Sequence, residues 1–72
     1  MSTERAQFIQ QEIAETLRQA NAAMARFLRK SETQDHSVML ERLVRSNRST
    51  VIPEANRAIN LWHHAEHLKR QL

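Results

Sequence analysis

The chain has 72 residues, no cysteine and no glycine, and its 11 Lys and Arg against 8 Asp and Glu give a net charge of +3. A chain of this length forms one domain with a small core, and the lack of cysteine excludes disulfides and thiolate metal sites as reinforcement. No apolar run approaches the roughly 20 residues of a membrane span, and the N-terminus lacks the apolar stretch of a signal peptide, so we expect a cytoplasmic protein.

The first predicted helix covers residues 3–30. Ser2 or Thr3 can cap its N-terminus, and Glu4 lies in the first turn, where the helix dipole favours an anion. The apolar residues of this segment recur every three or four positions, which is the helical period. The expected core stripe consists of Ala6, Ile9, Ile13, Leu17, Ala20, Met24, Phe27 and Leu28. Phe8 lies about 140° away from this stripe, which predicts an exposed or interface position.

The middle of the chain predicts a turn, a short helix and a loop. The polar, cap-rich segment 31–37 indicates the turn, and a long continuous helix is the alternative because no glycine marks the break. The short helix runs over 37–47 and is expected to bury Leu40, Leu43 and Val44. Residues 46–50 form the clearest loop, and Pro53 fits the first turn of a third helix over 53–71.

These elements predict an all-α fold for the whole chain, which we treat as one helical domain over residues 1–72. A long N-terminal helix with two shorter helices folded back along it is the simplest arrangement. It would be a helical hairpin or a three-helix bundle. Because so small a core is only marginally stable alone, we expect dimerisation to complete it.

The third predicted helix carries two apolar stripes. The first stripe consists of Ala55, Ile59 and Trp62, and we expect it to face the first helix. The second stripe, spaced like the a and d positions of a heptad, consists of Ala58, Leu61, Ala65, Leu68 and Leu72. A hairpin needs one stripe, so the second predicts contact with another chain.

A homodimer is the expected assembly. Its interface, or that with a foreign partner, would contain the second stripe together with Phe8 and Trp62. Trp62 has two interpretations. It is either a core aromatic at the centre of the hairpin or an anchor for a partner's pocket, since tryptophan is enriched among binding hot spots.

Histidines near the C-terminus match the HxxEH pattern of zinc proteases by letter, with His63 and His67 one helical turn apart. A catalytic zinc takes a third protein ligand and sits in a walled cleft, which a helical chain of this size can hardly build. The chain also has no cysteine nucleophile and no glycine-rich phosphate loop. We therefore expect solvated histidines, no metal, no cofactor and no enzymatic activity.

Arginines of the short helix offer a nucleic-acid alternative. Arg42, Arg45 and Arg48 are spaced by three and would line one side of that helix, where they could contact phosphates. A helix-turn-helix interpretation of residues 40–62 fails because Pro53 would fall inside the recognition helix. The simpler interpretation is that these arginines are solvated or paired with Glu41 and other nearby acids.

The sequence thus favours a non-enzymatic protein–protein interaction module that acts through an apolar helix face. Such a module would be a small adaptor, a chaperone subunit or an inhibitor of a larger protein target. The alternative function is a small basic dimer that binds DNA or RNA through the arginine cluster. Neither hypothesis involves a membrane.

Overall fold

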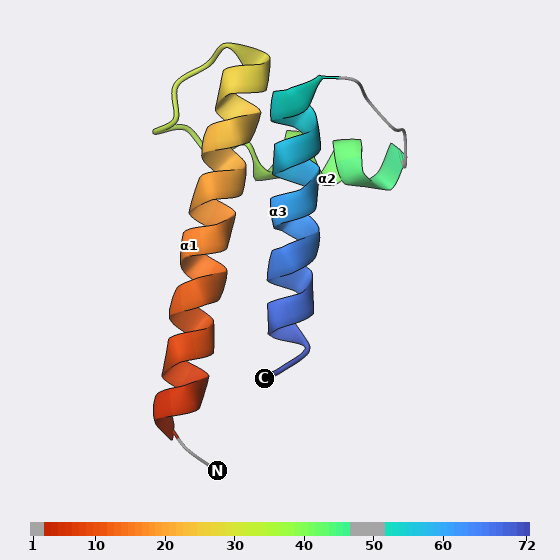
Figure 1. Cartoon of the computed structure of the whole chain (residues 1–72). Coiled ribbons are helices and arrows are strands. Elements are labelled where there is room, and N and C mark those ends of the chain that lie inside the picture. The colour runs from red at the N-terminus through yellow and green to blue at the C-terminus, as the bar shows by residue number, and fades with distance from the viewer. Residues whose placement is uncertain (1–2, 47–51) are drawn as a thin grey trace.

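The structure is a computed structural model that describes residues 3–46 and 52–72, and these form three helices (Figure 1). The helices are α1 (Thr3–Leu28), α2 (Ser37–Ser46) and α3 (Pro53–Lys69). Each helix begins at the predicted residue and ends one or two residues early, so the all-α class and the turn after the first helix are confirmed. Most of the predicted loop over 46–50 lies outside the described residues. Within the described ranges there is no strand, and no helix has the length and apolar character needed to cross a membrane.

Two of the helices form an antiparallel hairpin. α1 and α3 lie side by side, and α3 is the shorter, so the first turn of α1 extends beyond the C-terminus (Figure 1). α2 lies across one side of this hairpin and makes far fewer contacts than α1 and α3 make with each other. The molecule measures 41 × 26 × 18 Å. The expectation that both shorter helices run along the long one therefore holds for α3 and is wrong for α2.

Small side chains allow α1 and α3 to pack closely. Ala20 and Ala23 of α1 meet Ala58 of α3 in a buried cluster that also contains Met24 and Leu40. Because the distance between packed helices depends on the side chains at the contact, alanines bring the two backbones near one another. The larger apolar residues pack around this cluster and stay partly exposed; they are Phe27, Leu28, Leu43, Val44, Leu61 and Trp62.

The buried face of α1 differs in part from the predicted stripe. Ile9, Ile13, Ala20 and Met24 are buried as expected. Ala6 is predicted in the core but is exposed, because it lies near the start of α1, and the shorter α3 does not cover the first turn of that helix (Figure 1). The buried set also contains three residues outside the predicted stripe, namely Thr16, Ala23 and Ala25. Contacts with α3 on one side and with α2 and its loop on another widen the buried face.

The end of α1 is closed without a glycine. Arg29 adopts the left-handed conformation with a φ of 57°. The backbone N–H of Lys30 donates to the carbonyl of Ala25 at 2.9 Å, and the N–H of Arg29 donates to the carbonyl of Arg26 at 3.2 Å. These are the two hydrogen bonds of a Schellman motif, which ordinarily places glycine at the left-handed position. The arginine therefore carries a steric cost between its Cβ and the backbone that glycine would avoid.

This cap gives a first prediction. Arg29→Gly should raise the free energy of unfolding by about 0.5–1 kcal/mol, because relief of the left-handed strain outweighs the greater entropy of glycine in the unfolded chain. Thermal melting should show a midpoint raised by several degrees. Lys30→Gly is the matched control and should lower the midpoint or leave it unchanged. A lower midpoint for Arg29→Gly would contradict the strained cap.

Proline sets the start of α3. Ile52 is the N-cap residue and is extended, with φ −85° and ψ 115°, as expected for a residue that precedes proline. No side chain caps this terminus, but Pro53 removes one of the unpaired N–H groups at the helix start. α3 thus begins where the sequence predicted, which fixes the register of its apolar residues against α1.

Candidate protein-interaction site

The structure divides the predicted interface residues among three environments. Ala58 and Ala65 have no exposed surface in the single chain, because they pack inside the α1–α3 hairpin. The prediction that these two alanines contact another chain is therefore wrong. Leu61 and Leu68 are half-buried, and Leu61 packs against the core cluster. Near the chain termini, at the open end of the hairpin, Phe8 and Leu72 are 61% and 60% exposed.

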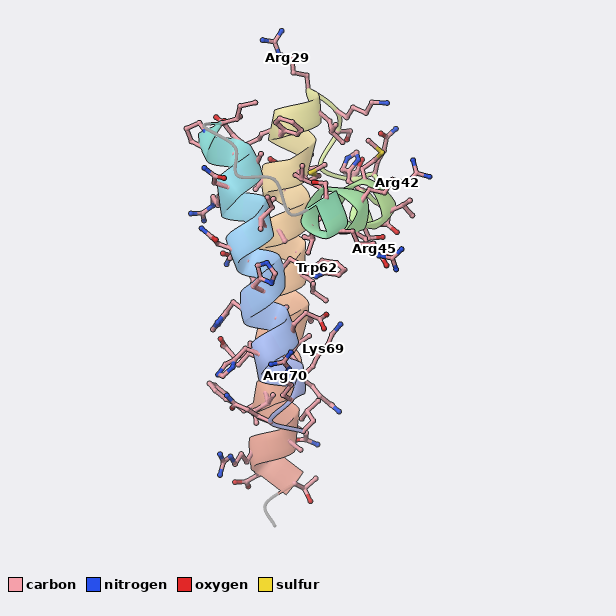
Figure 2. All side chains as sticks on the ribbon, turned by 90° about the vertical axis from the view of Figure 1, so that its right-hand side faces the viewer. Arg29, Arg42, Arg45, Trp62, Lys69 and Arg70 are labelled. Carbon is pink, nitrogen blue, oxygen red and sulfur yellow. The ribbon has the colours of Figure 1, made fainter. Side chains whose placement is uncertain are left out.

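The remaining member, Trp62, packs in the core as one of its two interpretations expects, and part of its side chain stays exposed. Its side chain is half-buried and packs against the core cluster, and it also lines a groove of about 560 Å³ beneath α2. We call this cavity the Trp62 groove. Its lining comes from α1, the α1–α2 loop, the start of α2, and α3: Ala14, Leu17, Arg18, Asn21, Glu32, Thr33, Gln34, Asp35, Ser37, Leu40, Trp62 and Lys69. Lys69 Nζ lies 6.0 Å from the centre of the Trp62 ring, the outer limit of a cation–π contact (Figure 2).

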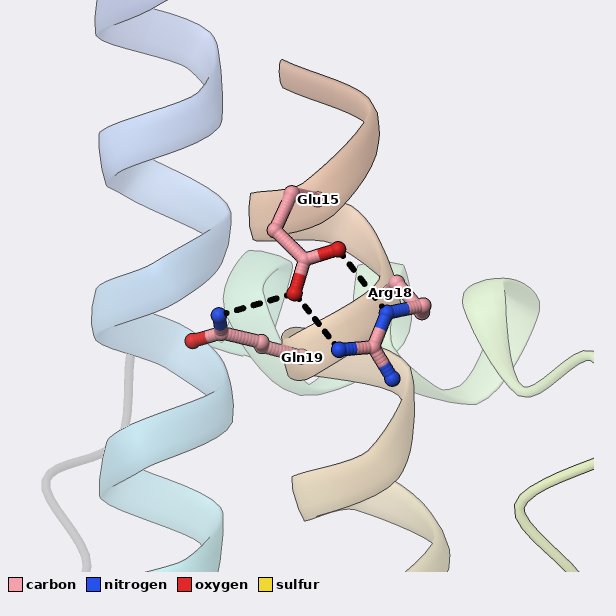
Figure 3. Close-up of polar contacts among 3 residues, drawn as sticks. All are labelled: Glu15, Arg18 and Gln19. Atoms are coloured by element: carbon pink, nitrogen blue, oxygen red, sulfur yellow. Dashed lines mark hydrogen bonds and ion pairs between the residues drawn. The ribbon is translucent and has the colours of Figure 1, made fainter. Parts of the chain in front are cut away.

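Charged side chains at the rim are held by neighbours on their own helices. Glu15 accepts hydrogen bonds from Arg18 Nε at 3.0 Å and from Gln19 Nε2 at 3.2 Å (Figure 3). The hydrogen bonds from Arg18 and Gln19 lower the pKa of Glu15 to about 2. On α3, Lys69 pairs with Glu66 at 3.1 Å. These exposed pairs add little stability, but they keep a cation at the α1 edge and another at the α3 edge of the groove.

Asn21 anchors the loop that forms one wall of the groove. Its Nδ2 donates to the carbonyls of Glu32 and Gln34 at 3.2 and 2.9 Å, and its Oδ1 accepts from the backbone N–H of His36 at 2.7 Å. Asn21 is not among the site residues predicted from the sequence. One feature of the sequence could have pointed to it. Asparagine is a weak helix former, and Asn21 nevertheless lies between two alanines in the most apolar part of α1.

The end of the loop is fixed by two more contacts. His36 is buried, and its Nε2 lies 2.8 Å from the carbonyl oxygen of Ser31, to which the ring N–H donates. Asp35 Oδ1 accepts from the backbone N–H of Ser37 at 2.9 Å. Hydrogen bonds from Ser37 lower the pKa of Asp35 below its usual value. The wall of the groove and the start of α2 are therefore held together.

The other predicted candidates lie away from the groove floor. His63, His64 and His67 are exposed on α3, and no three His, Cys, Asp or Glu side chains within the described ranges gather in a way that could hold a metal ion. Arg42 and Arg45 project from the exposed side of α2 (Figure 2). Arg45 pairs with Glu41 at 2.6 Å, as the simpler interpretation expected. Arg48 lies outside the described residues.

Comparison of this chain with family models, with curated proteins and with solved structures gives no significant match.

Proposed function

We propose that this chain is a non-enzymatic helical protein–protein interaction module that docks an apolar segment of a larger protein in the Trp62 groove. In this role it is a small cytoplasmic adaptor, chaperone subunit or inhibitor. The observation that carries the proposal is a half-exposed tryptophan above an apolar floor of Leu17 and Leu40. Tryptophan dominates binding energy at protein interfaces because it buries a large rigid surface and keeps one polar N–H group.

The shape and chemistry of the groove suit a protein segment. An apolar centre with a polar rim is the usual anatomy of a protein interface. The floor takes one or two apolar side chains of the partner. Arg18 and Lys69 stand at the rim as hydrogen-bond donors, and Asp35 stands there as an acceptor. Because the anchored loop and α2 wall the groove, the surface is largely ordered before binding, which reduces the entropy lost on association.

Ala14 allows a sharp test because it is exposed and lines the groove. Ala14→Arg places a long side chain across the floor and leaves the hairpin core untouched. The immobilised chain is exposed to an extract of its own cells, and the retained larger protein is identified and quantified. We expect Ala14→Arg to weaken its retention at least about tenfold, the loss typical of blocking a hot spot.

Ala6→Arg is the matched control, since Ala6 is an exposed alanine on the same helix and outside the groove lining. This variant should retain the target as the unmodified chain does. Equal retention by both variants, with circular dichroism showing that both are folded, would rule out the groove as the docking site.

The nucleic-acid alternative gives a different result in the same assay. Contact with phosphates releases counterions, so binding would fall steeply as salt rises. Replacing Arg42, Arg45 and Arg48 together by glutamine should leave retention of the target protein largely unchanged. If the retained material is nucleic acid and the triple variant loses it while staying folded, the arginine cluster is the functional site instead.

A further inference from the structure

A second, smaller cavity adjoins the Trp62 groove. Its volume of about 180 Å³ is several times the roughly 30 Å³ that one water molecule occupies in the liquid. We call it the arginine cavity, because Arg18 and Arg26 of α1 and Arg57 of α3 line it. Its other polar lining residues are Gln19 and Glu32. Arg18 and Glu32 also line the Trp62 groove, so the two cavities meet at these residues.

Small side chains between long ones create the arginine cavity. Its lining includes Ala22, which is half-buried, and Ala23, which is buried. Arg18 and Arg26 precede and follow Ala22 by four positions, so they lie one turn away from it on the same side of α1. Arg57 reaches the cavity from the neighbouring helix. The cavity is therefore a hollow over alanine that is framed by three arginine side chains from two helices.

Neighbouring carboxylates satisfy the three arginines to different degrees. Arg18 donates to Glu15 of its own helix through Nε at 3.0 Å and through Nη2 at 2.5 Å (Figure 3). Arg26 Nε lies 3.4 Å from a carboxylate oxygen of Glu32 in an exposed pair. Arg57 makes no hydrogen bond or ion pair with any residue that the structure describes. Three guanidinium groups therefore face one carboxylate in the lining, and positive charge stays in excess even when Glu15 is counted.

We infer that the arginine cavity binds a carboxylate of the segment that docks in the Trp62 groove, so that the partner carries an aspartate or glutamate beside its apolar anchor. This inference rests on the proposed groove function. An unmodified protein segment carries its negative charge as carboxylates, and a planar guanidinium group matches a carboxylate with two parallel hydrogen bonds. Glu32 already places a carboxylate beside Arg26 in this cavity. The partner's carboxylate takes up the unused donors of Arg57 and Arg26.

The arginine cavity acts on the choice of partner more than on the strength of binding. The side chain of Arg26 is 69% exposed, and Arg57 is exposed as well. Water and salt screen charges at such a rim, so the contact mainly speeds association with an acidic segment and weakens as salt rises. A segment with lysine or arginine at the same position meets like charge and is rejected. The Trp62 groove supplies the apolar contact, and the arginine cavity sets the charge that must lie next to it.

Titration with acetate, followed by NMR, tests the arginine cavity without any partner protein. The side-chain N–H signals of Arg26 and Arg57 and the backbone signal of Ala22 should shift together and reach a plateau. Acetamide has nearly the same shape but no charge, and it should leave these signals in place. Arg57→Gln should weaken acetate binding about three- to tenfold, because a charged donor group is replaced by a neutral one.

Arg70→Gln is the matched control, since it removes the same charge from the C-terminal end of α3, outside the lining of both cavities. Acetate should bind this variant as it binds the unmodified chain. Equal losses in the two variants would show that acetate responds only to the overall charge of the chain. That result, or shifts that do not reach a plateau, would overturn the arginine cavity as a carboxylate site.

Retention of the target protein connects the arginine cavity with the Trp62 groove. Arg57→Gln should weaken retention from the cell extract at low salt by a similar factor, whereas Arg70→Gln should not. If Arg57→Gln weakens acetate binding but leaves retention unchanged, the partner supplies no carboxylate and the inference is wrong, while the groove function stands. The groove function fails separately, when Ala14→Arg still retains the target. Ala14 lies outside the lining of the arginine cavity, so acetate should still bind that variant.

Discussion

Asn21→Ala is expected to lower the free energy of unfolding by about 2–3 kcal/mol. The substitution removes three hydrogen bonds, each with a net worth of about 0.5–1.5 kcal/mol, and leaves the backbone N–H of His36 without its acceptor. The better helix propensity of alanine offsets about 0.7 kcal/mol of the loss. The melting midpoint should fall by roughly 10–20 °C for a domain of this size. The loop and α2 should loosen first, because Asn21 joins both to α1.

Two further variants show whether the loss of stability comes from the hydrogen bonds of Asn21 to the loop or from a general change in α1. Gln11→Ala removes an exposed amide from the same helix and should change stability by less than about 0.5 kcal/mol. Asn21→Asp keeps an acceptor for the His36 N–H but cannot donate to Glu32 and Gln34, so its loss should be intermediate. Hydrogen exchange measures the effect locally, with faster exchange expected at the amides of His36 and Leu40. Unchanged exchange there in Asn21→Ala would show that the loop is held by other contacts.

Ala58→Leu is expected to destabilise the hairpin by about 3 kcal/mol, or to prevent folding. Ala58 has no exposed surface and faces Ala20 and Ala23 across the α1–α3 contact. A leucine there has no cavity to enter, so the helices must separate or the side chain must leave its preferred rotamer. Urea unfolding followed by circular dichroism measures the change. Ala6→Leu adds the same atoms at an exposed site and should change stability little.

A normal stability for Ala58→Leu would mean that α1 and α3 are not closely packed at this point. The same test separates the intrachain role of Ala58 from an interchain role. If Ala58 lay in a dimer interface, Ala58→Leu would alter the dissociation constant and leave the fold of the single chain intact.

Helix identity and boundaries followed from local chemistry. Pro53 fixed the start of α3 and the polar segment after α1 fixed its end, even though Arg29 rather than glycine takes the left-handed position. These features depend on residues close in sequence, so they can be predicted without a three-dimensional neighbour. The spacing of Ile9, Ile13 and Ala20 likewise reports the side of α1 that faces the core.

The helix against which each apolar stripe of α3 packs could not be predicted in the same way. The helical period shows that Ala58 and Leu61 lie near each other, but it does not show which of them points at α1. That depends on the three-dimensional packing of the helices, in which α2 lies across the hairpin with Leu40 in the core cluster and Asn21 binds the loop before it. Contacts between residues eleven to fifteen positions apart, such as that of Asn21 with His36, leave no periodic signal.

Thermal melting over a range of protein concentrations most directly tests whether another copy completes the small core. If folding and dimerisation are coupled, each tenfold rise in concentration adds about 1.4 kcal/mol to the apparent stability. For two chains of 72 residues this corresponds to a rise in the melting midpoint of roughly 4–5 °C. Phe8→Glu should melt lower and with a weaker dependence on concentration. If the melting midpoint of the unmodified chain stays constant over a hundredfold dilution, a single copy is stable alone. That result would contradict the claim that a second copy completes the core.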